Sequence, residues 1–173
     1  RTLLEIHTHL SAFYPGFFDE DRLENPSRVL LDLTYDERLA GSLQFNTKCA
    51  LRAGTSVRDR LSEDGWRLLN TMDEKLSRPR GSGATLELLE DLAVYIAAFS
   101  GITQENMSRG MGWRFLDMGR RLERTLQSIA ILRAVFSADR ERSRQLMEVV
   151  LLFQDSLRTY RLRYQSLYLD RAV

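Results

Sequence analysis

The sequence predicts an all-α fold, an antiparallel helical bundle of about six helices. Apolar residues recur at a spacing near 3.6 along almost the whole chain, and no strand-like alternation interrupts them. The three prolines, Pro15, Pro26 and Pro79, leave long stretches without a helix breaker. The connections between periodic stretches are mostly short, which favours antiparallel neighbours. With 173 residues, 43% of them hydrophobic, we expect one domain, residues 1–173, with a real core.

The first half of the chain is expected to hold three helices before a clear joint. An apolar stripe formed by Leu3, Ile6, Leu10 and Phe13 is ended by Pro15-Gly16. Asn25 is a favourable N-cap and is followed by proline, so a short helix should follow. A longer helix is expected over about residues 40–61.

The second half continues with longer helices. Ser62 can cap the segment "EDGWRLLNTMDEKL", which should stop near Ser77. The stretch "SRPRGSGA", residues 77–84, is the clearest loop in the chain. Thr85 is expected to cap the next helix, which runs toward Asn106. Two glycines in "SRGMG" predict a break or kink before a helix over residues 111–136. A last helix should run from about Asp139 to the end of the chain.

The helix over residues 111–136 has two unlike faces. With Leu122 at the centre of one face, the apolar residues within about 60° form a continuous stripe. This predicted core stripe comprises Met111, Phe115, Met118, Gly119, Leu126, Ile129 and Phe136. The opposite face carries Trp113, Asp117, Arg120, Arg124, Gln127 and Ile131. Apolar residues at both ends of that face predict a central helix whose charged middle is at least partly desolvated.

The charged middle of this helix is the main candidate site. Its members are Asp117, Arg120, Arg121, Glu123 and Arg124. Asp117 can reach both Arg120 and Arg121, and Glu123 can reach Arg120, by i, i+3 or i, i+4 spacing. Three interpretations stay open: a structural polar layer that fixes helix register, a ligand or substrate site, and a solvated face.

The segment "SVRDRLSEDGWRLLN", residues 56–70, supplies a secondary site. Its structural interpretation is a joint between two helices, with Ser62 as cap and Trp66 as core anchor. Its functional interpretation places Arg58 and Asn70 in one cavity with the Glu123 layer.

A second group of secondary candidates lies near the C-terminal end. Arg161 and Tyr164 share a strip of the last helix. The arginines there can bind an acidic partner, or pair with the carboxylates of an earlier helix. The arginines are Arg158, Arg161 and Arg163, and the carboxylates are Glu87, Glu90 and Asp91.

Several function classes are disfavoured by composition. The net charge of +1, with acidic residues interleaved throughout, argues against nucleic-acid binding. His7 and His9 are the only histidines, and their i, i+2 spacing is poor for one metal site, so we predict none. No Gly-x-Ser-x-Gly elbow marks a serine nucleophile, and "RPRGSGA" has no P-loop spacing for a nucleotide phosphate. We predict no cofactor. Cys49 is the only cysteine, which favours a reducing cytoplasmic location, and no apolar run approaches a membrane span.

Three segments resemble a known family. The most specific is "NMSRGMGWRFLDMGRRLER", residues 106–124; residues 56–70 and "YRLRYQ", residues 160–165, add to it. Together they resemble the Alpha-E family, an all-helical domain named for a Glu-Arg pair, and the resemblance covers essentially the whole chain. That pair would be Glu123-Arg124 in this sequence.

The resemblance also implies how much of a domain is present. Family members normally begin with a helix similar to "NLYWLGRYLERAE" and continue past "YLDRAV", so we expect a fragment that is incomplete at both termini. Where two Glu-Arg helices face each other in a full domain, half of that polar layer would be missing here.

The resemblance implies a gene context in bacteria rather than a reaction. Domains of this kind accompany circularly permuted ATP-grasp proteins that resemble amide or peptide ligases, and often transglutaminase-like proteases. Our first hypothesis is therefore an accessory or interaction domain for an ATP-grasp ligase, without catalytic activity of its own. The second is an enzyme or small-molecule-binding domain that uses the Arg/Glu layer. The third is an oligomeric scaffold, since cut bundles expose apolar faces.

Overall fold

The computed structural model describes residues 2–11, 16–79, 81–136, 140–154 and 156–164. Within these ranges the chain forms nine α-helices and two short 3-10 helices, and no strand. The expected all-α fold is therefore confirmed. Phe13, Ser137 and the terminal "YLDRAV" lie outside the described residues.

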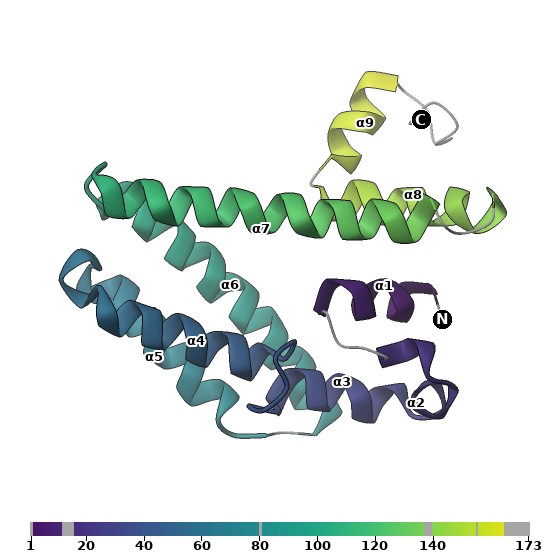
Figure 1. Ribbon diagram of the computed structural model, residues 1–173, viewed down its shortest axis with the longest axis horizontal. Helices are drawn as coiled ribbons and strands as arrows, with labels where there is room; N and C mark the ends of the chain where they lie inside the picture. The colour runs from purple at the N-terminus through teal and green to yellow at the C-terminus, as the bar shows by residue number, and fades with distance from the viewer. Residues whose placement is uncertain (1, 12–15, 80, 137–139, 155, 165–173) are drawn as a thin grey trace.

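The helices fall into two groups (Figure 1). In chain order they are α1 Thr2–Ser11, η1 Gly16–Phe18, α2 Glu20–Glu24, α3 Pro26–Tyr35, α4 Leu43–Ser56, η2 Arg58–Arg60, α5 Glu63–Leu76, α6 Ser82–Asn106, α7 Met111–Phe136, α8 Arg140–Phe153 and α9 Leu157–Tyr164. Helices α4, α5 and α6 pack together at one end of the molecule. At the other end, α1 and α8 pack against α7, which runs along the top of the view.

Local signals explain most helix ends. The Asn25 side chain accepts a hydrogen bond from the amide of Arg28, and the Ser62 hydroxyl accepts one from the amide of Gly65, so both expected caps are confirmed. The expected break is confirmed too, because α6 ends at Asn106 and α7 begins at Met111. Such caps stabilise a helix start because the N–H groups of the first turn have no partner within the helix.

Three expected boundaries were wrong. The last helix, expected to run unbroken to the end of the chain, is divided into α8 and α9 between Phe153 and Leu157. The helix predicted over residues 40–61 starts only at Leu43, after a Ser42 cap, and its end is replaced by η2. Thr85 does not cap α6, which begins one turn earlier. Thr85 is instead buried, its hydroxyl donating to the carbonyl of Gly81 at 3.0 Å and contacting the Tyr35 hydroxyl at 3.1 Å. These internal partners hold Thr85 within the helix.

The first core cluster lies between α5 and α6. Its buried members are Leu69, Met72, Leu76, Leu88 and Leu92. Helix α4 covers it closely at Gly54, where an added Cβ would lie 3.0 Å from a methyl group of Leu69. The small residue therefore permits this close approach of two helices.

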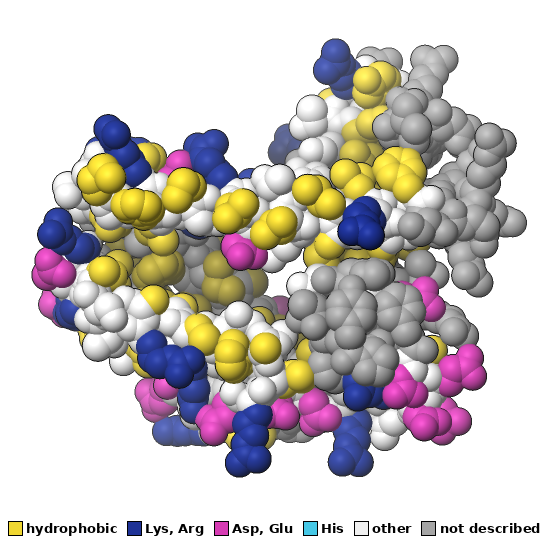
Figure 2. All heavy atoms as spheres, viewed as in Figure 1, with side chains coloured by type: hydrophobic (Ala, Val, Ile, Leu, Met, Phe, Trp, Pro, Cys, Tyr) yellow, Lys and Arg dark blue, Asp and Glu magenta, His cyan; other side chains and the backbone are white. Residues whose placement is uncertain are grey.

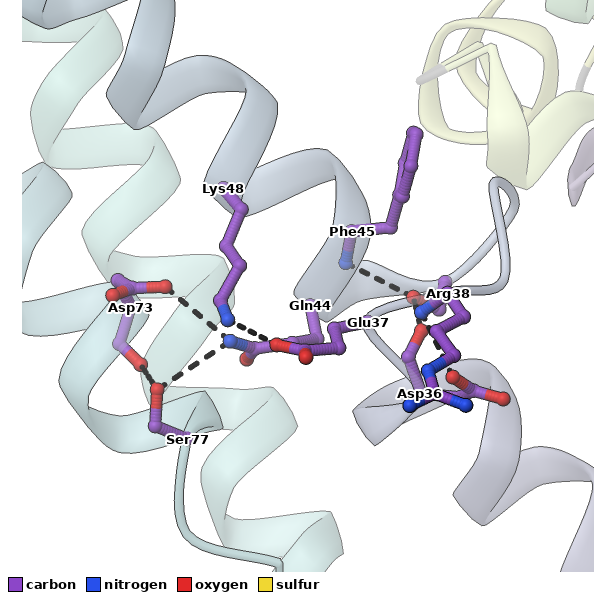
Figure 3. A network of polar contacts seen from close by, with 9 residues as sticks. Asp36, Glu37, Arg38, Gln44, Phe45, Lys48, Asp73 and Ser77 are labelled. Carbon is purple, nitrogen blue, oxygen red and sulfur yellow. Dashed lines mark hydrogen bonds and ion pairs between the residues drawn. The ribbon is translucent and has the colours of Figure 1, made fainter.

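A polar network fixes α4 on α5 (Figure 3). Gln44 is buried, and its amide nitrogen donates to Asp73 Oδ1 at 3.3 Å and to Ser77 Oγ at 3.4 Å. One turn further along α4, Lys48 forms an ion pair with Glu37. Because buried polar groups need partners, this network restricts how α4 can slide along α5.

The second core cluster lies between α1, the C-terminal half of α7, and α8. It comprises Ile6, Ile131, Val135, Leu146, Met147 and Val150. Helix α1 is anchored at its far end by the buried Thr8 hydroxyl, which accepts a hydrogen bond from the amide of Phe17 at 2.8 Å. Gly16, at φ 52°, makes this turn; a Cβ there would lie 2.4 Å from Thr8 Cγ2.

Candidate functional site: the cleft beside α7

Helix α7 buries the face opposite to the one that the sequence predicted. The stripe centred on Leu122 was expected in the core, yet Leu122 is 58% exposed. Its large neighbours on the same face are also exposed, namely Met111, Phe115, Met118, Leu126, Ile129 and Phe136. Figure 2 shows hydrophobic side chains along the surface of α7. We call these residues, with Leu122, the outer stripe.

The buried residues of α7 lie on the opposite side. Ile131 and Val135 are buried in the second core cluster, and Trp113 is half-buried beneath the guanidinium of Arg109, 4.4 Å from the ring centroid. The expectation that both ends of this face are covered is confirmed, but the expected central position is wrong. Within the described residues α7 forms an edge of the molecule, because α1 and α8 pack against its C-terminal half (Figure 1).

An open cleft of about 1340 Å³ lies between the two covered ends of α7. Its walls are the C-terminal half of α6, the middle of α7 and Gln154, which follows α8. Figure 2 shows the hollow below α7 on this side of the molecule. All five members of the predicted polar layer line the cleft: Asp117, Arg120, Arg121, Glu123 and Arg124. The structure therefore brings these residues together on an open cleft rather than inside a bundle.

Asp117 is the best-paired member of the layer. Its carboxylate accepts a hydrogen bond from Arg121 Nε at 2.7 Å and lies 3.5 Å from Arg120 Nη2. The hydrogen bond from Arg121, with the charges of both arginines, holds the pKa of Asp117 below its usual value. These are the pairs that i, i+3 and i, i+4 spacing predicts. Two of the three cleft arginines are thus already shared with one carboxylate.

Glu123 and Arg124 differ from Asp117. Both are exposed to the cleft, and neither forms an ion pair among the residues that the structure describes. The expected Glu123–Arg120 pair does not form because Arg120 turns to Asp117. The backbone is fixed nearby, since Ser128 Oγ donates to the Arg124 carbonyl at 2.7 Å and accepts from Gln154 Nε2 at 2.8 Å.

The residues of segment 56–70 form a separate structural joint. The Arg58 guanidinium lies 5.2 Å from the centroid of the Trp66 ring and pairs with Glu63 at 2.5 Å. Asn70 donates to the carbonyl of Trp66 at 2.8 Å. Neither Arg58 nor Asn70 is among the residues that line the cleft, so the shared cavity predicted for them was wrong. Their side chains are satisfied within the joint, and Trp66 packs on the first core cluster.

The C-terminal candidates also find local partners. Arg161 pairs with Glu148 at 2.5 Å, and Tyr164 stacks on Tyr160 with ring centroids 4.9 Å apart. Asp91 is instead paired with Lys75 at 2.9 Å. The pairing of these C-terminal arginines with carboxylates of α6 was therefore wrong for Arg161, because α9 packs on α8.

Neutral amides were missed as site residues. Gln104, Gln127 and Gln154 all line the cleft, with Ser100 and Ser128. Only Gln127 had a sequence signal, because it lies one turn from Glu123 and Arg124 on the same helix. Gln104 and Gln154 come from other elements and carry no charge or motif that would mark them.

Comparison with known proteins decides the family. All of residues 1–173 match Alpha-E, described as a predicted alpha-helical domain with a conserved ER motif. The chain belongs to the Alpha-E family. Glu-Arg occurs three times in this Alpha-E chain, at 37–38, 123–124 and 141–142, and the family resemblance assigns the motif to Glu123-Arg124. That pair lines the cleft, whereas Glu37 pairs with Lys48 on α4.

The curated relatives of this Alpha-E domain are longer proteins. Uncharacterised proteins Mb2597 of Mycobacterium bovis and Rv2567 of Mycobacterium tuberculosis are each 32% identical to it over 146 residues. The match covers 78% of this chain and 16% of each relative. No solved structure matches the chain. None of the helices in the described ranges is long and apolar enough to cross a membrane.

Proposed function

We propose that this Alpha-E domain is a helical docking domain for an ATP-grasp amide ligase of the peptide-forming class, in the bacterial cytoplasm. One observation carries the proposal: a whole face of α7 consists of large apolar side chains in contact with water. The ligase as partner comes from the family resemblance. Transglutaminase-like proteins, which the resemblance also implies, are a further prediction for the same gene context.

The outer stripe has the size of a helix-binding surface. It runs from Met111 to Phe136, which at 1.5 Å per residue is about 38 Å. Exposed apolar side chains scattered singly are ordinary, but a contiguous row of them marks an interaction site. No described element covers the stripe, and Gly119 beside it has nothing within 4 Å of an added Cβ. A partner helix can therefore approach α7 closely along this face.

The charges beside the stripe define the partner further. Arg114 and Arg121 border it, and Arg133 lies in line with it, all three exposed. Cations beside an apolar surface favour a partner that carries carboxylates there. We therefore expect the ligase to contribute an amphipathic helix with apolar residues at 3.6 spacing and acidic residues on its flanks.

Co-purification of the chain with the ATP-grasp protein encoded beside it tests the proposal. Leu122→Glu places a charge in the middle of the stripe and should abolish capture. Leu162→Glu is the matched control, because Leu162 is equally apolar and exposed but lies on α9. Capture that survives Leu122→Glu, or no capture of the ligase by the unaltered chain, contradicts the proposal.

Light scattering distinguishes the scaffold alternative. If a second copy of the chain occupies the stripe, the unaltered protein is a dimer or larger and Leu122→Glu is a monomer. That result would replace the ligase with self-association as the role of the outer stripe. A monomer in both cases leaves the stripe open for a different protein, as the docking proposal requires.

A further inference from the structure

We propose that the cleft beside α7 binds short peptides with free ends, with Arg124 holding the α-carboxylate and Glu123 the α-ammonium group. The proposal concerns the cleft that Glu123 and Arg124 line, which of the outer stripe only Phe115 reaches, so it does not rest on the docking function. It assigns a ligand class to the Glu-Arg pair.

The charges in the cleft leave one cation and one anion without an ion-pair partner. Asp117 already takes Arg121 and Arg120. Glu123 and Arg124 remain as the charged residues that face the cleft without an ion pair in the described part of the chain. Arginine suits a carboxylate or a phosphate, but a phosphate dianion at Arg124 would be repelled by the neighbouring Glu123. A zwitterion satisfies both groups.

The spacing of the two residues sets the length of the ligand. Neighbouring positions on a helix point about 100° apart, so the two charged ends diverge from the axis. A single amino acid carries its charges on one carbon and cannot span diverging groups. Each further residue adds about 3.3–3.6 Å between the ends of an extended chain. A dipeptide or tripeptide therefore fits the pair better than a free amino acid.

The neutral lining matches the body of a peptide. Gln104, Gln127 and Gln154 present amides from three different elements, and each offers both a donor and an acceptor, as a peptide bond does. Gln154 is held in place by its hydrogen bond to Ser128. Ile96 and Phe115 supply exposed apolar surface at the wall for one side chain of the ligand. The cleft, at about 1340 Å³, is large enough for such a molecule.

Isothermal titration of the 173-residue chain tests the proposal with a defined set of probes. The probes are alanyl-leucine, its N-acetyl form, its C-terminal amide, free leucine and inorganic phosphate. The variants are Arg124→Gln and Glu123→Gln. Arg114→Gln on α7 and Glu105→Gln on α6 are matched controls, since both residues are exposed and outside the cleft lining. The melting temperature of each variant is measured first. It should equal that of the unaltered chain, because the substituted residues are exposed.

Alanyl-leucine should bind more tightly than any other probe. Loss of one charged hydrogen-bonding partner should weaken binding about tenfold or more. Amidation of the peptide and Arg124→Gln should each produce this loss, and together no further loss, because they remove the same contact. N-acetylation of the peptide and Glu123→Gln should likewise each weaken binding, and together cause no further loss. Both controls should bind as the unaltered chain does.

Three results would overturn the proposal. One is phosphate binding more tightly than the dipeptide in an Arg124-dependent way, which would make this an anion site. Another is equal weakening by Arg114→Gln, and the third is no heat of binding for any peptide at millimolar concentration. Leu122→Glu should leave peptide binding unchanged, so failure of the docking proposal and failure of this one give different results.

Discussion

The two faces of α7 differ in the opposite sense from those of an ordinary amphipathic helix. The outer stripe around Leu122 is apolar and exposed, whereas the inner face carries Asp117 and Arg120 toward a cleft. Apolar residues near the C-terminal end of the inner face, Ile131 and Val135, hold the helix against α1 and α8. The comparison teaches that a helix can be held by a few apolar residues near one end, while its most apolar face stays exposed.

The largest expected effect is the loss of stability when a buried residue of the inner face is truncated. Ile131→Ala removes a side chain that is only 2% exposed and should lower the free energy of unfolding by about 2–5 kcal/mol. Leu122→Ala removes a side chain of the same size, yet should cost less than about 0.5 kcal/mol because Leu122 is exposed. Urea denaturation of both variants measures the difference. Equal losses would mean that the outer stripe is buried in the folded chain.

A second prediction concerns the turn that follows α1. Helix α1 covers the inner face of α7 near the C-terminal end of α7. Gly16→Ala forces a Cβ into the Thr8 side chain at a left-handed position, so it should cost about 1–3 kcal/mol. Gly83→Ala is the control, because nothing lies within 4 Å of its added Cβ, and it should be neutral or stabilising. Thermal unfolding reports both. A neutral Gly16→Ala would show that α1 does not need this turn to hold α7.

The smallest expected effect is a change in the pKa of Asp117, which lies on the inner face. Arg121 and Arg120 lower the pKa of Asp117 in the folded chain, so the pair stabilises the fold above the usual pKa of an aspartate. This contribution should be lost as pH falls through the lowered pKa. Arg121→Gln should return that pKa toward its usual value, and Arg133→Gln, on the outer side, should not. Carboxyl chemical shifts followed through an acid titration give the values, and an unchanged Asp117 in Arg121→Gln contradicts the pairing.

Most of the fold could be predicted from local signals. The caps at Asn25 and Ser62, and the glycine-containing break before Met111, are decided within a few residues. The Asp117–Arg121 pair follows from helical spacing alone. Thr85 could not be placed, because its burial depends on Tyr35, which lies 50 residues away.

The orientation of α7 could not be predicted for a related reason. Helical periodicity places Leu122 and Ile131 on opposite faces but cannot say which face meets the rest of the molecule. The decision comes from α1 and α8, whose buried residues Ile6 and Val150 meet Ile131 and Val135. The packing of α8 on α7 also places Gln154 at the cleft, and no local sequence signal predicts this. The charged members of the site were therefore predictable, and the neutral ones were not.

Thiol labelling of the two faces tests the account most directly. In a Cys49→Ser background, Leu122→Cys and Ile131→Cys each provide one reactive thiol on α7. The thiol at 122 should react at nearly the rate of an unfolded peptide, and that at 131 slower by orders of magnitude, because it reacts only after local opening. Addition of the ligase partner should then protect position 122. Equal protection of both thiols in the isolated monomer would contradict the two-faced description of α7.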